Sequence, residues 1–172
     1  MFDSLSPMHE DLKRKKKPGT IDQPKPKVVK QMKSDQPNKT RKKRKDAGHN
    51  VKFPVSFELQ RLFKASRKRC CLIYPQYKEQ LKQTKYNTLL LQYALDNPYI
   101  VEWNQTYKDC STYLHTMLRE ERYDEIAGIY GIALERNLSN RKCVFMMCVS
   151  ALKWIEKEGN YEEIIKQIEP TS

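Results

Sequence analysis

Two runs of adjacent lysine and arginine are the residues of this chain whose type and spacing most clearly suit them to bind a ligand. The first run is Lys13, Arg14, Lys15, Lys16 and Lys17, and the second is Arg41, Lys42, Lys43, Arg44 and Lys45. Five clustered cations are typical of nuclear import signals and of segments that contact nucleic-acid phosphates. Because bound phosphates release counterions, such binding weakens steeply as salt is added. The gap of 23 residues between the runs favours two independent clusters over one bipartite signal.

The remaining residues that could carry chemistry do not form a recognisable reactive set. Five cysteines in a chain without an export signal indicate reduced thiols in a nuclear or cytosolic compartment. The pairs Cys110/His115 and Cys143/Cys148 have an offset of five, which turns two helical side chains roughly 140° apart, so core packing is favoured over zinc. His115 has no nucleophile or carboxylate at a fixed spacing, and no glycine-rich phosphate loop is present. The sequence therefore predicts no enzyme, no metal site and no cofactor.

The positive charge belongs to one end of the chain. Residues 1–52 hold 16 lysines and arginines against 6 acidic residues, whereas residues 53–172 hold 17 against 15. The first 52 residues also contain five of the nine prolines and only one of the 17 aromatic residues. Such a segment cannot bury enough apolar surface to offset its ordering entropy, so 1–52 is predicted to be a disordered basic tail. A solvated arm without a specific partner is the simpler alternative. The tail has no amphipathic apolar face, and no membrane partner is predicted.

Residues 53–172 are predicted to form one helical domain, since their apolar residues recur with helical spacing. A first helix follows Pro54, a second ends near Leu95, and a third begins at Asn97-Pro98 and continues to Met117. A fourth begins at Tyr123, and a fifth, central helix runs from Ser139 to Gly159. The predicted core includes Leu62 of the first helix, the apolar face of the second from Tyr86 to Ala94, and Trp154 of the fifth. In the fourth helix, the residues predicted to face inward are Ile126, Ile129, Tyr130 and Ala133. The first helix extends the basic character of the tail and gives candidate phosphate contacts at Arg61, Lys64, Arg67, Lys68 and Arg69.

Two similar helix starts suggest an internal repeat. The segments 121–126 and 159–164 each place a tyrosine, two acids and an isoleucine in order, 38 residues apart. Each resembles the turn of a tetratricopeptide-like helix hairpin. The predicted fold class is therefore all-α: stacked helix hairpins, in a short tetratricopeptide-like solenoid, with an irregular helical bundle as the alternative.

The segment from Cys110 to Tyr130 carries a further resemblance. Its Cys110, the pair Tyr113-Leu114, Leu118, and the turn from Tyr123 to Ala127 are similar to the first helix hairpin of a family of TATA-box-binding-protein-associated factors for RNA polymerase I. This resemblance implies a nuclear or nucleolar component of the promoter selectivity complex. In that role, helical-repeat surfaces would bridge the polymerase and promoter-bound factors.

Three functions follow from these features. The first is a nuclear interaction or scaffold protein of the transcription machinery, in which a helical-repeat domain binds a protein partner and the basic arm contacts nucleic acid. The second is a direct RNA- or DNA-binding protein, of cellular or viral origin, that uses the tail together with the first helix. The third is a generic helical adapter whose tail serves only import.

Overall fold

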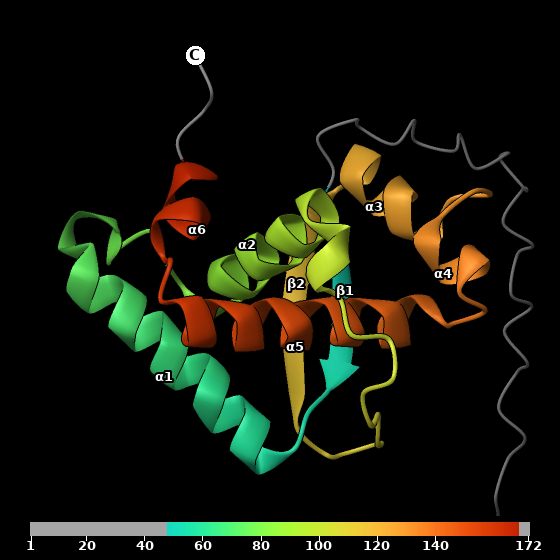
Figure 1. Ribbon diagram of the computed structural model, residues 1–172, viewed down its shortest axis with the longest axis horizontal. Helices are drawn as coiled ribbons and strands as arrows, with labels where there is room; N and C mark the ends of the chain where they lie inside the picture. Colours follow the sequence, from blue (N-terminus) through green and yellow to red (C-terminus); the bar gives the residue numbers. More distant parts are fainter. Residues whose placement is uncertain (1–47, 169–172) are drawn as a thin grey trace, which may run out of the picture. The chain divides into compact units, whose positions relative to one another are not determined.

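The computed structural model of the protein describes residues 48–168, and the two predicted basic clusters at 13–17 and 41–45 lie outside that range. Within it, the chain forms helices and two strands, and the strands are far apart in sequence (Figure 1). The helices are α1 (Phe57–Ile73), α2 (Gln83–Asp96), α3 (Glu120–Ala127), α4 (Ile132–Glu135), α5 (Asn140–Glu158) and α6 (Glu162–Lys166). The strands are β1 (Gly48–Pro54) and β2 (Tyr113–Arg119), and the 3₁₀ turns are η1 (Pro75–Tyr77) and η2 (Pro98–Ile100).

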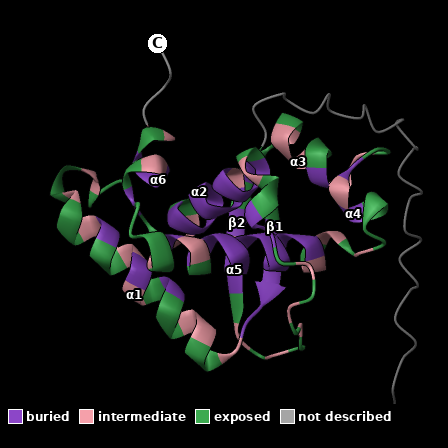
Figure 2. Ribbon diagram, in the orientation of Figure 1, coloured by how far each residue is buried: buried purple, intermediate pink, exposed green. Residues whose placement is uncertain are grey.

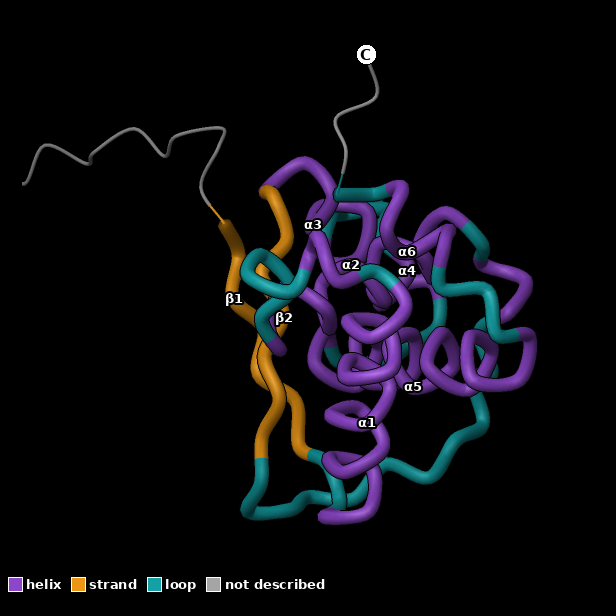
Figure 3. Tube along the Cα trace, turned by 90° about the vertical axis from the view of Figure 1, so that its left-hand side faces the viewer, coloured by secondary structure: helices purple, strands orange, loops and turns teal. Residues whose placement is uncertain are grey.

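The sheet overturns the prediction of an all-α fold of stacked helix hairpins. β1 and β2 pair antiparallel, with Gly48 opposite Arg119 and Pro54 opposite Tyr113. Burial alternates along both strands, as expected for a sheet with one covered face: Val51, Phe53, Leu114, Thr116 and Leu118 are buried, and the residues between them are half-buried or exposed. Figure 3 shows the two strands together along the left side, with most of the helices to their right.

The predicted third helix over 97–117 is therefore wrong. Its start forms only η2, the following residues form a loop, and its end forms β2. The leucines at 114 and 118 suit a helical spacing, but Leu114, Thr116 and Leu118 equally suit an alternating one, and pairing with β1 favours the strand. The segment that resembles a helix hairpin is thus a strand followed by α3. The predicted domain boundary at residue 52 also falls inside β1, so residues 48–52 belong to the fold rather than to a tail.

Helix α5 is the centre of the core, as predicted from its almost wholly apolar sequence. Ser139 caps its N-terminus by accepting a hydrogen bond from the Lys142 amide. Gly159 ends it in the left-handed conformation, with φ of 70°, which glycine adopts without steric penalty. α5 contacts α2, β1 and four other elements. In Figure 2, the residues coloured as buried are concentrated on α5, α2 and the two strands. Phe145 of α5 packs edge-on against Phe53 of β1, with ring centroids 6.3 Å apart.

Helix α2 covers the outer edge of β2 with polar side chains. The Asn87 side-chain amide donates to the His115 carbonyl at 3.0 Å, and the Thr88 hydroxyl accepts from the Met117 amide at 2.8 Å. Both side chains are almost completely buried. They replace the hydrogen bonds that a third strand would supply, so a two-stranded sheet is closed on this side.

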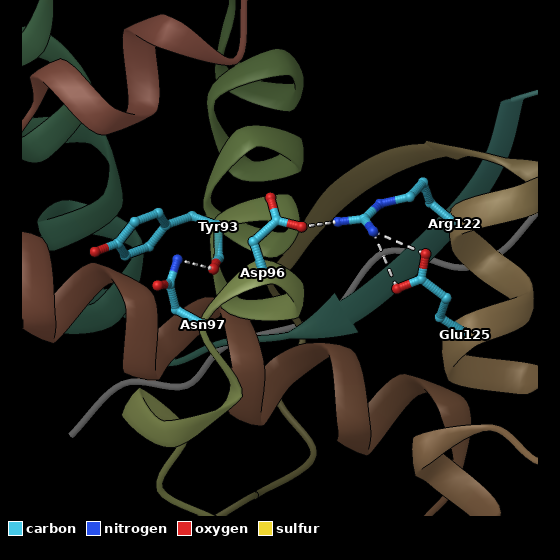
Figure 4. Close-up of polar contacts among 5 residues, drawn as sticks. All are labelled: Tyr93, Asp96, Asn97, Arg122 and Glu125. Carbon is cyan, nitrogen blue, oxygen red and sulfur yellow. Dashed lines mark hydrogen bonds and ion pairs between the residues drawn. The ribbon is translucent and has the colours of Figure 1, made fainter.

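Helix α3 is attached to the rest of the fold by charged and aromatic contacts. Arg122 pairs with Asp96 at the end of α2 and donates to Glu125 at 2.8 Å (Figure 4). In the same view, the side chain of Asn97 donates to the Tyr93 carbonyl and closes the last turn of α2. On the strand side, the His49 ring stacks on Tyr123 at 3.7 Å. These contacts orient the turn that leads from α3 to α4.

The turn between α3 and α4 corrects a second prediction about the core. Ile129 and Tyr130, predicted to point inward, are 82% and 99% exposed. Ile126 and Ala133, predicted on the same face, are buried as expected. The difference arises because α3 stops at Ala127 and the chain turns before α4 begins, so one continuous helical face never forms.

Candidate nucleic-acid interface

Five of the cations predicted to contact phosphates lie within the described residues, and all five belong to helix α1. Its sequence holds five lysines and arginines against one glutamate. Ser56 caps the helix by accepting from the Leu59 amide. The buried face is formed by Phe63, Ser66 and Cys70, whereas Leu62, predicted to face the core, is 50% exposed. Because the buried face is narrow, most of the helix circumference faces outward, and the cations are spread around it.

Two of these cations are used within the fold. The Arg67 guanidinium donates to the Leu81 carbonyl at 3.1 Å and holds the turn before α2 against α1. Arg69 pairs with Glu156 of α5, and this carboxylate raises the pKa of the guanidinium. Glu156 in turn accepts from the Tyr161 hydroxyl at 2.6 Å. Arg67 and Arg69 therefore both have partners within the fold, although Arg67 is only half-buried and Arg69 is exposed.

The other three cations are available to a ligand. Arg61, Lys64 and Lys68 are exposed, and within residues 48–168 no carboxylate lies within ion-pair distance of any of them. Arg61 lies over the ring of Phe57, with its guanidinium carbon 5.9 Å from the ring centre. Unpaired cations on one helix face repel one another, and binding a polyanion relieves that repulsion.

A hollow of about 440 Å³ adjoins this surface, where the end of α1 meets η1. Its cationic lining comes from Arg67, Lys68 and Lys78, and its apolar lining from Cys71, Leu72 and Pro75. Leu72 is 81% exposed, so the apolar part is open to a ligand. Cations beside apolar side chains suit a ligand that joins phosphates to a weakly polar group, and a nucleotide has both. We call this site the basic hollow.

Lys78 was not predicted as a binding residue, because it does not belong to a run of basic residues. It is a single lysine next to Glu79, ten residues beyond Lys68, and only the turn through η1 brings it to the same hollow.

The outer face of the sheet is a second basic surface that the sequence did not reveal. Lys52 and Arg119 are exposed on it, together with Tyr113, which is 44% exposed. The sequence predicted a helix through Met117, and a helical period does not separate the residues of this face from the core. In the strand, exposed and buried residues alternate with a period of two.

The cysteines and histidines do not gather into a metal site in the described part of the chain, where no three potential ligands come together. Cys70, Cys143 and Cys148 are buried, and burial raises the pKa of Cys70 and of Cys143 to about 12. The Cys148 thiol contacts the Asn87 carbonyl at 3.8 Å. These thiols stay protonated at neutral pH and act as packing groups.

Comparisons with known proteins add no assignment. Family models, curated protein sequences and solved structures gave no significant match to this chain. Among residues 48–168, no helix is both long and apolar enough to span a lipid bilayer.

Proposed function

We propose that this protein binds nucleic acid, and that α1 and the basic hollow are the folded part of its binding surface. The observation that carries the proposal is the separation of roles among the α1 cations. Arg69 is exposed but already paired with Glu156, whereas Arg61, Lys64 and Lys68 face solvent without a carboxylate partner in the described region. A surface that only kept the protein soluble would not need an adjoining hollow lined by Lys68, Lys78 and apolar side chains.

The proposal extends to the basic clusters at 13–17 and 41–45, which would add non-specific phosphate contacts. The second cluster ends three residues before β1 begins, so a short stretch of chain joins it to the folded domain. Such a two-part arrangement gains affinity because binding of one part raises the effective concentration of the other.

A nuclear location, import through the basic clusters, and a part in transcription by RNA polymerase I are further proposals. The first two rest on the lysine and arginine runs, and the third rests on the resemblance of residues 110–130. A scaffold role with a protein partner is also a proposal, and it rests on the sequence.

The binding surface is tested with two double variants of the full chain that remove the same charge. Lys68→Ala/Lys78→Ala alters the basic hollow, and Lys52→Ala/Arg119→Ala alters the outer face of the sheet. Affinity for a fluorescein-labelled duplex DNA and for a single-stranded RNA is measured by anisotropy over a series of salt concentrations.

We expect the first variant to weaken binding and to reduce the slope of log K against log salt by about 1.4 to 1.8, as for two lost phosphate contacts. The second variant should have clearly less effect. Equal losses in both variants would show that binding follows net charge and would refute the proposed site. No salt-dependent binding by the unmodified protein would refute the function itself.

A further inference from the structure

An apolar patch projects from the turn between α3 and α4. Ile129, Tyr130 and Leu134 are 82%, 99% and 67% exposed, and together with Glu135 they line a depression of about 270 Å³. Tyr130 makes almost no contact with its own domain. A cluster of large, exposed apolar side chains is unusual on a soluble surface and typically marks a binding site. We call these residues the apolar patch.

The backbone holds the apolar patch in this outward position. A Cβ atom at Gly131 would lie 2.4 Å from the Ile126 carbonyl oxygen, and one at Gly128 would lie 2.5 Å from that of Asp124. Both glycines therefore allow a close backbone approach that other residues could not make. Buried Ile126 and Ala133 anchor the two sides of the turn. The outward position of the apolar patch therefore follows from the backbone path of this turn.

A second depression on α1 is complementary to the apolar patch. It has a volume of about 330 Å³ and is lined by Glu58, Arg61, Leu62 and Ala65. It shares no lining residue with the basic hollow, although Arg61 belongs both to this depression and to the proposed nucleic-acid surface of α1. Its apolar lining comes from Leu62 and the small residue Ala65, and its charged lining from Glu58 and from Arg61, which has no carboxylate partner within residues 48–168.

Charge decides which surface the apolar patch fits. Helix α3 has four acids, Glu120, Glu121, Asp124 and Glu125, against the one cation Arg122, and Glu135, which pairs with Arg136 at 3.7 Å, borders the apolar patch. A patch-to-patch dimer would bring these acids together, whereas α1 has five cations against one acid. α1 and the α3–α4 turn lie toward opposite ends of α5 (Figure 1), so one molecule cannot make this contact with itself.

We propose that the partner of the apolar patch is a second copy of this chain. Tyr130 and Leu134 of one copy enter the Leu62/Ala65 depression on α1 of the next, and Glu135 faces Arg61. Because the two surfaces differ, the contact is head-to-tail and leaves one free surface at each end. The copies would then form open rows that repeat the basic hollow. This self-association does not require nucleic acid or the proposed function.

The test is sedimentation velocity of the full chain, freed of nucleic acid, over a range of concentrations. The unmodified protein should form concentration-dependent species larger than a dimer. Leu62→Asp and Tyr130→Ser should each weaken self-association about tenfold or more, as for loss of a central contact. The control Ile73→Asp changes an α1 residue that is 55% exposed but lies outside the depression, and it should associate normally.

Mixing the two disrupted variants gives the decisive result. Leu62→Asp retains an intact apolar patch and Tyr130→Ser an intact depression, so together they should form a one-to-one complex and nothing larger. In the charge pair, Arg61→Glu or Glu135→Arg alone should weaken association, and the double variant should restore it. A monomeric unmodified protein, persistent dimers of Leu62→Asp, or an equal effect of Ile73→Asp would each overturn the proposal.

Discussion

Replacing Thr88 with valine tests whether α2 substitutes for a missing strand. The Thr88 hydroxyl accepts from the Met117 amide at 2.8 Å and donates to the Thr84 carbonyl at 2.8 Å. Thr88 is 4% exposed, so water cannot readily replace the hydroxyl. Valine keeps the shape of the side chain but leaves the Met117 N–H without an acceptor. A buried donor left unpaired costs about 1–3 kcal/mol, and we expect Thr88→Val to lower the free energy of unfolding by about 2 kcal/mol.

Thr116→Val is the matched control, because it makes the same chemical change at another buried site. Thr116 is completely buried, but its hydroxyl donates only to the Val51 carbonyl, at 3.4 Å. Its loss strands no backbone donor, and valine suits a strand, so the change should be below about 1 kcal/mol.

The assay is urea unfolding of the full chain followed by circular dichroism, with hydrogen exchange at the Met117 amide as the local readout. Thr88→Val should both destabilise the protein and speed exchange at Met117. If Thr88→Val costs no more than Thr116→Val, then α2 does not close the edge of β2 and the reasoning fails.

Two further predictions concern burial. Tyr130→Ala should change stability by less than about 0.5 kcal/mol, because its side chain is 99% exposed, whereas the half-buried Trp154, edge-on to Tyr99 at 6.0 Å, should cost about 2 kcal/mol when replaced by alanine. Thermal melts compare the two variants, and equal losses would contradict the exposed position of Tyr130. Burial raises the pKa of Cys143 from 9.0 to about 12, so the folded state keeps a neutral thiol that ionises in the unfolded chain. The contribution of Cys143 to the free energy of unfolding is complete below about pH 9, and it is lost as the pH rises toward 12. Urea unfolding at alkaline pH should therefore show a shallower decline for Cys143→Ala than for the unmodified protein, and identical slopes would refute the assignment.

The sequence by itself determined the features that depend on neighbouring residues. Helix α5 was predictable because Ser139, a long apolar run and Gly159 are local signals for its start, body and end. The inward face of α2, from Tyr86 to Ala94, followed from helical spacing in the same way. The concentration of cations before residue 52 and along α1 is a property of composition, and no tertiary contact is needed to see it.

Tertiary structure decided the features that depend on residues far apart in sequence. Residues 113–119 have no strong helical or strand preference of their own, and pairing with β1 some 65 residues away makes them a strand. The role of each α1 cation likewise depends on distant partners: Glu156 pairs with Arg69 and the Leu81 carbonyl holds Arg67, whereas Lys64 and Lys68 have no carboxylate partner among the described residues. The physical reason is that spacing along the chain indicates which face of a helix or strand a residue occupies. The residues that it contacts from other elements are determined only when the chain folds.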